Sequence, residues 1–256
     1  MARVLVTGSA QGIGAETARQ LIAQGHDVVL HARNSARAAA AREAVSGQAD
    51  VVIGELTSVE QTTHLAAAAA ATGPFDAIIH NAGIGGGAPQ RVLTEDGLEQ
   101  IFQVNVVAPY VLSALIPLAP RMVYLTSGLE SDGVWVPEDL QWASREWHGM
   151  QAYSDSKMHV SMLAFELAAR NPELAINVVD PGWIKTRMGG PNAVDEVETG
   201  AATQVWLATS PDPAATGTGR YWKHLAELTP NPVTQDPAAR AVLLAELERL
   251  TGVGLA

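Results

Sequence analysis

The chain of 256 residues contains no cysteine, which excludes disulfide bonds and thiolate metal sites. Basic residues are scarce as well, because 16 Lys and Arg stand against 27 Asp and Glu and give a formal net charge of −11. Nucleic-acid binding requires a basic face, so we expect no nucleic acid among the partners of the protein. The histidines are scattered without metal-ligand spacing, and we expect no metal site.

Long hydrophobic runs are also missing. The longest uncharged apolar stretch, residues 106–120, contains three prolines and is too short to span a bilayer. The sequence enters a strand-like pattern at Arg3, which leaves no room for a signal peptide. We therefore expect a cytoplasmic protein without a membrane anchor.

Apolar residues make up 47% of the chain, which is enough for a sizeable core. Many of them occur in continuous runs rich in valine and isoleucine, as is typical of strands buried on both faces. These runs lie at residues 3–7, 27–31, 50–54, 75–80, 121–126 and 174–179, with a last short one near Tyr221.

Alanine-rich stretches, which form helices readily, alternate with the strand-like runs. They lie at residues 16–24, 36–45 and 64–71. The last of them falls between Ser58, a suitable N-cap, and Gly73, a suitable stop, and is therefore expected to be a packed helix. The alternation predicts a single α/β domain over residues 1–256, doubly wound around a mostly parallel sheet of seven strands with helices on both faces.

A glycine cluster of Gly8, Gly12 and Gly14 follows the first strand and opens the first helix. Glycines at this place let the backbone approach a pyrophosphate, and the helix N-terminus favours its negative charge. The alternative is a tight strand-to-helix turn that binds no ligand. The position between strand and helix favours the dinucleotide site.

The end of the second strand is where such a site contacts the adenosine ribose. An acidic residue there suits a free 2′-hydroxyl, and an arginine suits a 2′-phosphate. The sequence has no acid at this place but has Arg33, with Arg37 one turn later. This pattern favours NADP(H) over NAD(H), and the alternative is that Arg33 is a solvated surface charge.

Tyr153 and Lys157 lie four residues apart and so share one face of a helix. A free tyrosine has a pKa of about 10, and a nearby cation lowers that pKa. Tyr153 is then suited to act as general acid when a carbonyl is reduced and as base when an alcohol is oxidised. Ser127 follows the strand at 121–126, where α/β sites form, and its hydroxyl can bind the substrate oxygen. Such a Tyr–Lys pair alone is most often ordinary helix surface, and only the accompanying motifs favour catalysis.

In this order, the motifs resemble the short-chain dehydrogenase/reductase family from Val4 to about Thr186. The resemblance implies a Rossmann-type fold and a catalytic tetrad of Asn105, Ser127, Tyr153 and Lys157. It also implies that Lys157 binds the nicotinamide ribose and that Asn105 holds a water in a proton relay to Lys157. The residues implied to bind the cofactor are Thr7, Gly8, Gln11, Gly12, Ile13, Gly14, Arg33, Asn34, Glu55, Leu56, Asn81, Ala82, Gly83, Tyr153, Lys157, Pro181, Gly182, Ile184 and Thr186.

The largest departure from the family pattern is an insertion at about residues 128–151. It carries three of the six tryptophans, Trp135, Trp142 and Trp147, together with His148. Longer segments of this kind resemble the retinol-dehydrogenase-like and carbonyl-reductase-like branches. The tryptophans either line an apolar substrate pocket or pin the insertion to the domain, and His148 is expected to be structural.

Two further features bear on function and assembly. Residues at about 187–210 begin with Gly, Pro and acids, as a substrate lid would, and the alternative is a plain surface loop. In many relatives the helices that contain Asn105 and Tyr153 pack against their copies in a tetramer. An insertion beside that face would cover it, so we expect a monomer or homodimer instead.

These observations predict an NADP(H)-dependent oxidoreductase that transfers a hydride between nicotinamide and a small-molecule carbonyl or alcohol. One alternative is an epimerase or dehydratase on a nucleotide sugar, but only about 70 residues follow Thr186, few for the larger substrate domain of those relatives. Another is a non-catalytic NADP-binding sensor, which would tend to lack Tyr153 or Lys157.

Overall fold

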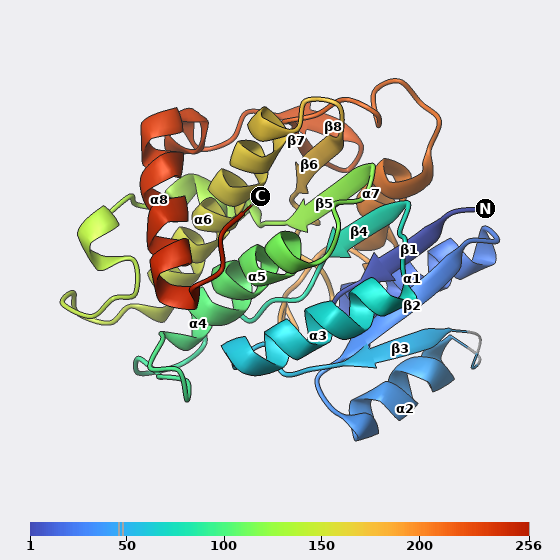
Figure 1. Ribbon diagram of the computed structural model, residues 1–256, viewed down its shortest axis with the longest axis horizontal. Helices are drawn as coiled ribbons and strands as arrows, with labels where there is room; N and C mark the ends of the chain where they lie inside the picture. The colour runs from blue at the N-terminus through green and yellow to red at the C-terminus, as the bar shows by residue number, and fades with distance from the viewer. Residues whose placement is uncertain (46, 48, 256) are drawn as a thin grey trace.

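The computed structural model describes residues 1–45, 47 and 49–255 (Figure 1). One sheet of eight strands has the order β3-β2-β1-β4-β5-β6-β7-β8, with β1 to β7 parallel and β8 antiparallel to β7. The strands are β1 Arg3–Val6, β2 Asp27–Ala32, β3 Asp50–Ile53, β4 Ala77–His80, β5 Arg121–Leu125, β6 Ala175–Val179, β7 Tyr221–Lys223 and β8 Ala226–Leu228. The sheet has one strand more than expected, because β8 is three exposed residues long and lacks the apolar run of a buried strand.

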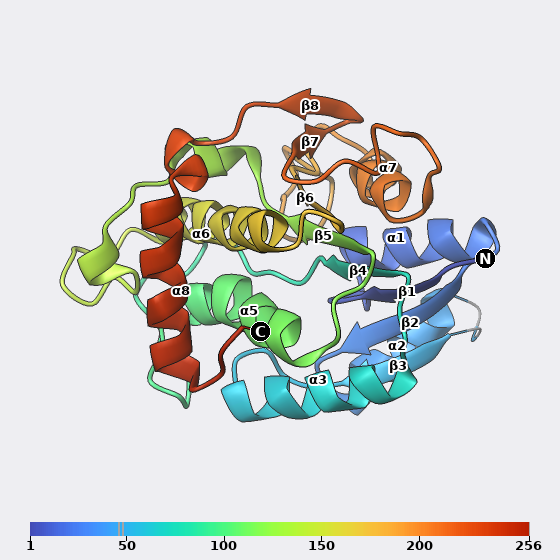
Figure 2. The ribbon, with the colours of Figure 1, turned by 45° about the horizontal axis from the view of Figure 1, so that its top comes forward.

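Helices cover both faces of the sheet, as Figures 1 and 2 show. They are α1 Gly12–Ala23, α2 Ser35–Ala44, α3 Val59–Thr72, α4 Gln100–Phe102, α5 Ala108–Leu115, α6 Gly149–Arg170, α7 Val197–Thr209 and α8 Pro237–Thr251. The expected cap of α3 is confirmed, since the Ser58 hydroxyl accepts a hydrogen bond from the Gln61 amide at 3.3 Å and Gly73 ends the helix. None of the described helices is both long and apolar enough to cross a membrane.

Alternate residues of the central strands belong to two separate hydrophobic cores. On β1, Leu5 packs in the core under α3, α5, α6 and α8, whereas Val4 and Val6 pack in the core under α1, α2 and α7. Successive side chains of a strand point to opposite faces, so a strand between two helical layers must be apolar at every position. This is why the strands read as continuous apolar runs.

The strand order reverses beside β1, which lies between β2 and β4. At such a reversal the connections leave β1 and β4 on opposite sides of the sheet, and a crevice opens at the carboxyl ends of the strands. The segments that follow β1, β4, β5 and β6 therefore meet at one edge. Gly8, Ala82, Ser127 and Pro181 all lie on these segments.

The C-terminal helix α8 packs against α6 on the outer side of the molecule (Figures 1 and 2). Its buried Leu243 and Leu247 join the same core as α6. The segment after α8 returns to α5, where the Tyr110 hydroxyl donates a hydrogen bond to the carbonyl oxygen of Val253 at 2.7 Å. The exposed surface of the α5–α6 pair is thus partly covered by the chain itself.

Candidate active site

Ser127, Tyr153 and Lys157 meet at the carboxyl edge of the sheet. Ser127 follows β5, and its hydroxyl accepts a hydrogen bond from the Leu129 amide at 3.3 Å. Tyr153 lies in the first turns of α6, and its phenol is close to the Ser127 side chain. One turn later, the Lys157 Nζ lies 5.7 Å from the centroid of the Tyr153 ring. The three side chains predicted from the sequence are thus brought together.

The environment of these side chains destabilises the charged forms of Tyr153 and Lys157. Burial raises the pKa of the Tyr153 phenol, the neighbouring Ser127 side chain lowers it, and the carboxylate of Asp180 raises it further, for a net increase. Burial lowers the pKa of Lys157 to about 8, and Asp180 opposes that change. The Lys157 ammonium donates a hydrogen bond to the carbonyl oxygen of Leu125 at 3.0 Å, which helps to stabilise a buried cation.

Asn105 lies in a π-helical stretch, Gln103–Val107, that connects α4 to α5. Such stretches often occur at functional sites. The Asn105 amide oxygen accepts from the Ile84 amide at 2.8 Å, and its nitrogen donates to the Ile84 carbonyl at 3.0 Å and to the Ser156 hydroxyl at 2.9 Å. A Cβ on Gly83 would lie 3.2 Å from the Asn105 oxygen and 3.3 Å from the Lys157 Nζ. Asn105 therefore ties the turn after β4 to the helix that carries Tyr153.

The backbone of the glycine loop requires glycine at two positions. Gly12 has a φ of +57°, and a Cβ on it would lie 3.4 Å from the Thr186 methyl group across a narrow gap. No side chain of the described residues caps the N-terminus of α1, so its first amides can bind an anion. A Cβ on Gly14 would lie 2.4 Å from the Asn81 amide nitrogen, so only glycine fits there. These features suit a pyrophosphate.

Asn81 and Ala82 tie β4 to this loop. The side-chain Nδ2 of Asn81 donates to the Thr7 carbonyl at 2.8 Å, and the backbone amide of Ala82 donates to the Thr7 hydroxyl at 3.0 Å. Gly8 packs directly against Ala82, since a Cβ on Gly8 would lie 2.9 Å from its Cα. This segment therefore fixes the position of the glycine loop.

The basic residues expected at the ribose end lie beside the glycine loop. Arg33 is exposed at the end of β2, and Asn34 caps α2 by accepting from the Arg37 amide at 3.0 Å. The Arg37 guanidinium reaches back to the Gln11 side chain at 3.2 Å. Leu56, expected at the adenine, is buried and packs in the sheet core, and Glu55 is half-buried.

His31 has a role that the sequence did not suggest. Its Nδ1 accepts a hydrogen bond from the Gly8 amide at 3.0 Å, and its Nε2 contacts the Gly54 carbonyl at 2.9 Å. These partners fix the neutral form with the proton on Nε2, and burial lowers the pKa of the ring. The feature of the sequence that could have revealed this role is a polar side chain within an otherwise apolar strand.

The segment after β6 lies partly against the glycine loop and partly against α7. In this segment Gly182 has a φ of +99°, and Thr186 faces Gly12 of the loop. The Ile184 side chain packs against Gly200 of α7, so only its backbone is available to a cofactor. Of the expected lid at 187–210, the first part is irregular, whereas α7 is a regular helix that packs against α1.

The insertion is held to α6 by Asp155, which lies between Tyr153 and Lys157. Its buried carboxylate accepts hydrogen bonds from four donors, all at 2.9 to 3.2 Å. The donors are the Val134 amide, the Trp142 indole nitrogen, the Arg145 guanidinium and the Gln151 side chain. Sequence reasoning missed Asp155, because an acid inside a helix gives no sign of partners that lie before the helix begins.

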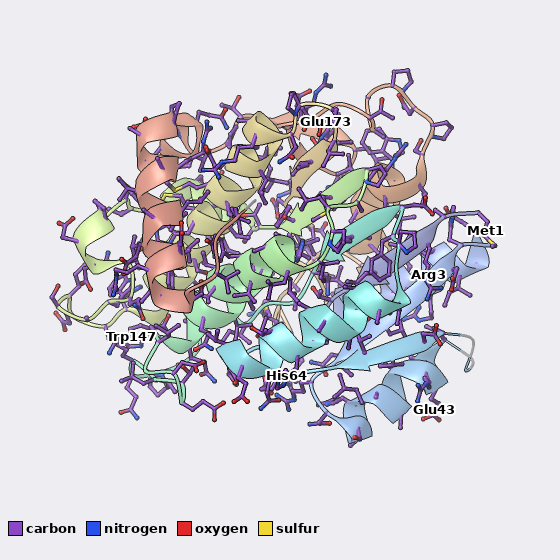
Figure 3. The ribbon with its side chains drawn as sticks, viewed as in Figure 1. Met1, Arg3, Glu43, His64, Trp147 and Glu173 are labelled. Atoms are coloured by element: carbon purple, nitrogen blue, oxygen red, sulfur yellow. The ribbon has the colours of Figure 1, made fainter. Side chains whose placement is uncertain are left out.

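The tryptophans of the insertion serve mainly to anchor it. Trp142 is 6% exposed and has its ring 3.9 Å from the Arg145 guanidinium carbon. Trp147 packs edge-on against Trp142, and its indole nitrogen donates to the Ala88 carbonyl at 3.0 Å. Figure 3 places Trp147 at the end of the molecule opposite Met1 and Arg3. His148 caps α6 by accepting from the Gln151 amide at 3.1 Å, which is a structural role.

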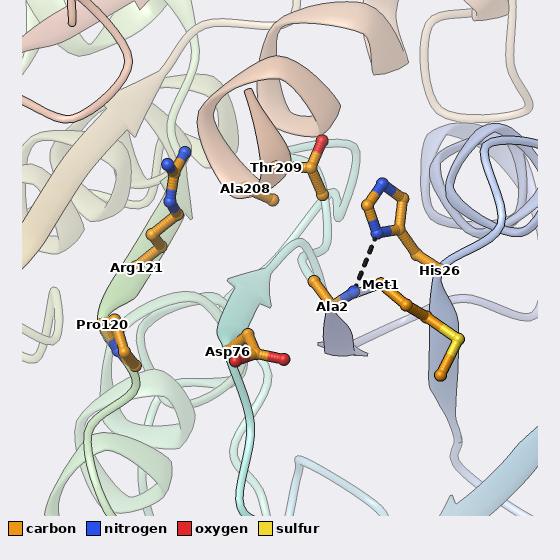
Figure 4. A pocket seen from close by; sticks show the side chains of 8 residues that line it. All are labelled: Met1, Ala2, His26, Asp76, Pro120, Arg121, Ala208 and Thr209. Atoms are coloured by element: carbon orange, nitrogen blue, oxygen red, sulfur yellow. Dashed lines mark hydrogen bonds between the residues drawn. The ribbon is translucent and has the colours of Figure 1, made fainter. Parts of the chain in front are cut away.

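A surface hollow of about 280 Å³ lies at the other edge of the sheet (Figure 4). Its lining includes Met1, Asp76 and Arg121, which are at the amino ends of β1, β4 and β5. Because the strands are parallel, this hollow is separated by the length of the sheet from Ser127 and Tyr153. It is therefore distinct from the candidate active site. Among the described residues, no group of three His, Asp or Glu side chains is placed to hold a metal ion.

Comparison with known proteins places these features in context. A family model described as short chain dehydrogenase matches residues 2–196. A short-chain dehydrogenase of Penicillium rubens, chyC, is 39% identical over all of this chain and 99% of its own length. A crystal structure of a Mycobacterium paratuberculosis protein superposes with a TM-score of 0.86 at 26% identity, covering 100% of this chain and 95% of that one. A blue fluorescent protein from a metagenomic library, solved with NADPH, has a TM-score of 0.70 at 25% identity, covering 87% and 95%.

We predict that Asp155→Ala loosens the insertion, because four donors lose one buried acceptor. Breaking a buried, hydrogen-bonded ion pair typically costs about 3–5 kcal/mol, so the free energy of unfolding should fall by about that amount. Urea denaturation measures the change, and Asp132→Ala, at an exposed acid of the same insertion, is the matched control. Equal stability of the two variants would contradict the anchoring role.

Proposed function

The chain belongs to the short-chain dehydrogenase/reductase family of NAD(P)-dependent oxidoreductases, and on that premise we propose that it transfers a hydride between NADP(H) and a carbonyl or alcohol substrate, with Tyr153 as general acid or base. The contact of Tyr153 with Ser127, together with Lys157 one turn away, carries this proposal. These three groups can hold an oxygen atom, move its proton and stabilise the resulting charge.

In the reductive direction the substrate oxygen lies between the Ser127 hydroxyl and the Tyr153 phenol. Tyr153 gives its proton to that oxygen, and Lys157 stabilises the phenolate that remains. In the oxidative direction Tyr153 takes the proton back. Asn105 keeps the turn after β4 and the helix α6 in fixed relative positions through Ile84 and Ser156.

The chain's own residues suit NADP(H). When bound, this cofactor supplies or accepts the hydride. Gly8, Gly12 and Gly14 with the amides of α1 would hold its pyrophosphate, and Arg33 and Arg37 flank the place of the 2′-phosphate. Lys157, beside Gly83, would reach the nicotinamide ribose.

Apolar side chains lie near each of the segments that form the site. Leu129 lies two residues after Ser127, and Met150 lies one turn before Tyr153. Met188 packs over Gly85, and all three side chains are more than one third exposed. They support a small-molecule substrate that presents an apolar body next to its carbonyl or alcohol group.

Tyr153→Phe is expected to keep the fold and NADPH binding but to lower kcat by about 10²–10⁴-fold, because the ring stays and only the proton donor is removed. Absorbance of NADPH with a panel of aldehydes and ketones measures turnover, and fluorescence measures binding. Tyr110→Phe, which removes a hydroxyl far from the site, is the matched control. Near-normal kcat for Tyr153→Phe would exclude Tyr153 as the acid.

Arg33→Ala is expected to raise the KM for NADPH and to leave the KM for NADH nearly unchanged, because only NADPH carries the 2′-phosphate. Steady-state kinetics with both cofactors test this. Arg42→Ala removes an exposed charge further along α2 and should change neither KM. Equal KM values for the two cofactors in the unmodified protein would overturn the preference.

We further propose a monomer or homodimer. The face that α5 and α6 would offer to a second copy is partly covered by α8 and by Val253. Light scattering at several concentrations measures the mass. A stable mass near four times 26.9 kDa would refute this assembly.

A further inference from the structure

A buried carboxylate lies directly behind the Ser127 turn. Asp180 is 2% exposed and is the first residue after β6. Its Oδ1 accepts a hydrogen bond from the Gly182 amide at 2.9 Å, and its Oδ2 lies 2.8 Å from the Lys223 Nζ on β7. A Cβ on Gly128 would lie 3.0 Å from the same Oδ2. The carboxylate therefore lies between the Ser127–Gly128 turn and the Pro181–Gly182 turn.

The neighbouring strand contributes two groups to this place. Tyr221 and Lys223 lie two positions apart on β7 and so share one face of the strand. The Tyr221 hydroxyl donates to the Ser127 carbonyl oxygen at 3.4 Å, and Lys223 pairs with Asp180. Glu130, 1% exposed, lies close enough to Asp180 to feel its charge, and its Oε1 accepts from the Asn231 amide at 2.8 Å. Asp180, Lys223, Tyr221 and Glu130 form a polar cluster under the catalytic turn.

Burying charges is costly, and apolar residues of similar volume would often serve stability equally well. The ion pair is also unequal in its burial, since Asp180 is almost fully enclosed whereas the Lys223 side chain is 37% exposed. The enclosed anion is therefore screened by solvent less than its partner cation. Its charge adds to burial in raising the pKa of Tyr153 and opposes the burial that lowers the pKa of Lys157.

We propose that Asp180 and Lys223 are a positioning pair for the reaction, in which Asp180 holds the Ser127–Gly128 and Pro181–Gly182 turns together and the pair sets the local charge at Tyr153 and Lys157. The inference rests on the proposed function, in which Tyr153 moves the proton. Lys157 keeps its own role beside Tyr153. Asp180 acts through these residues and does not contact the substrate.

The two members of the pair have opposite effects on proton release. Asp180→Asn removes an anion, so Tyr153 and Lys157 both lose their protons at lower pH. Lys223→Gln removes a cation, so Tyr153 and Lys157 both lose their protons at higher pH. Because the shift has the same sign for both groups in each variant, it does not matter which of them an observed titration reports. Glu130 and Tyr221 also face Asp180, and they are the same in every variant.

The test is a pH titration of the full-length chain by NMR, with tyrosine labelled at the ring carbon that bears the hydroxyl. The chain has four tyrosines, and the Tyr153 signal is the one that Tyr153→Phe removes. We expect its midpoint to move down in Asp180→Asn and up in Lys223→Gln by about half a pH unit or more, which corresponds to a roughly threefold change in the ionised fraction. The pH limb of kcat/KM for alcohol oxidation should move in the same two directions.

Three controls complete the design. Lys223→Arg keeps the cation and should leave the midpoint in place. Arg220→Gln removes a cation from the exposed pair with Glu227 beside β7 and should also leave it in place. The double variant Asp180→Asn with Lys223→Gln restores the local charge and should return the midpoint close to its original value.

Shifts in the same direction for both single variants, or no shift in chains that remain folded by circular dichroism, would overturn the inference. If Asp180→Asn fails to fold, the comparison of Lys223→Gln with Arg220→Gln still decides it. Opposite shifts without turnover of any carbonyl or alcohol would reject the proposed function and leave the electrostatic role standing. If turnover depends on Tyr153 but the titration midpoint does not move in any variant, the positioning pair is rejected and the proposed function stands.

Discussion

A parallel sheet covered by helices on both faces has no free surface of its own. In the central strands, neighbouring residues belong to the two different cores, as Leu5 and Val6 illustrate. Chemistry is therefore confined to the ends of the strands, and a parallel arrangement brings all carboxyl ends to one edge. The positions of Gly8, Asn81, Ser127 and Pro181 follow from this single constraint.

Much of this could be predicted from the sequence, because the relevant signals are local. Continuous apolar runs indicated the parallel strands, glycines between a strand and a helix indicated the tight turn from β1 into α1, and the spacing of Tyr153 and Lys157 indicated their shared helix face. In each case the partners lie within a few residues or follow from the strand order. The family membership, the oxidoreductase class and the fold are confirmed.

The parts that the sequence did not reveal depend on contacts between distant residues. Nothing near Asp155 indicates that it accepts hydrogen bonds from residues before the helix, and nothing near His31 indicates that it contacts both Gly8 and Gly54. Asp180 and Lys223 are 43 positions apart and meet only because β6 and β7 are neighbours. Strand β8 and the packing of α8 on α6 likewise follow from tertiary contacts and not from local pattern.

The attachment of residues 134–145 to α6 through one carboxylate has a consequence for protein engineering. Their hydrogen bonds to α6 converge on Asp155, and Arg145 links them to Asp139. A segment of another length could therefore be grafted between Gly133 and Trp147 if it kept an arginine and an acid in these places. The same dependence means that a graft that lost them would disturb the turn of helix between Tyr153 and Lys157, so loop exchange and active-site geometry are linked in this scaffold.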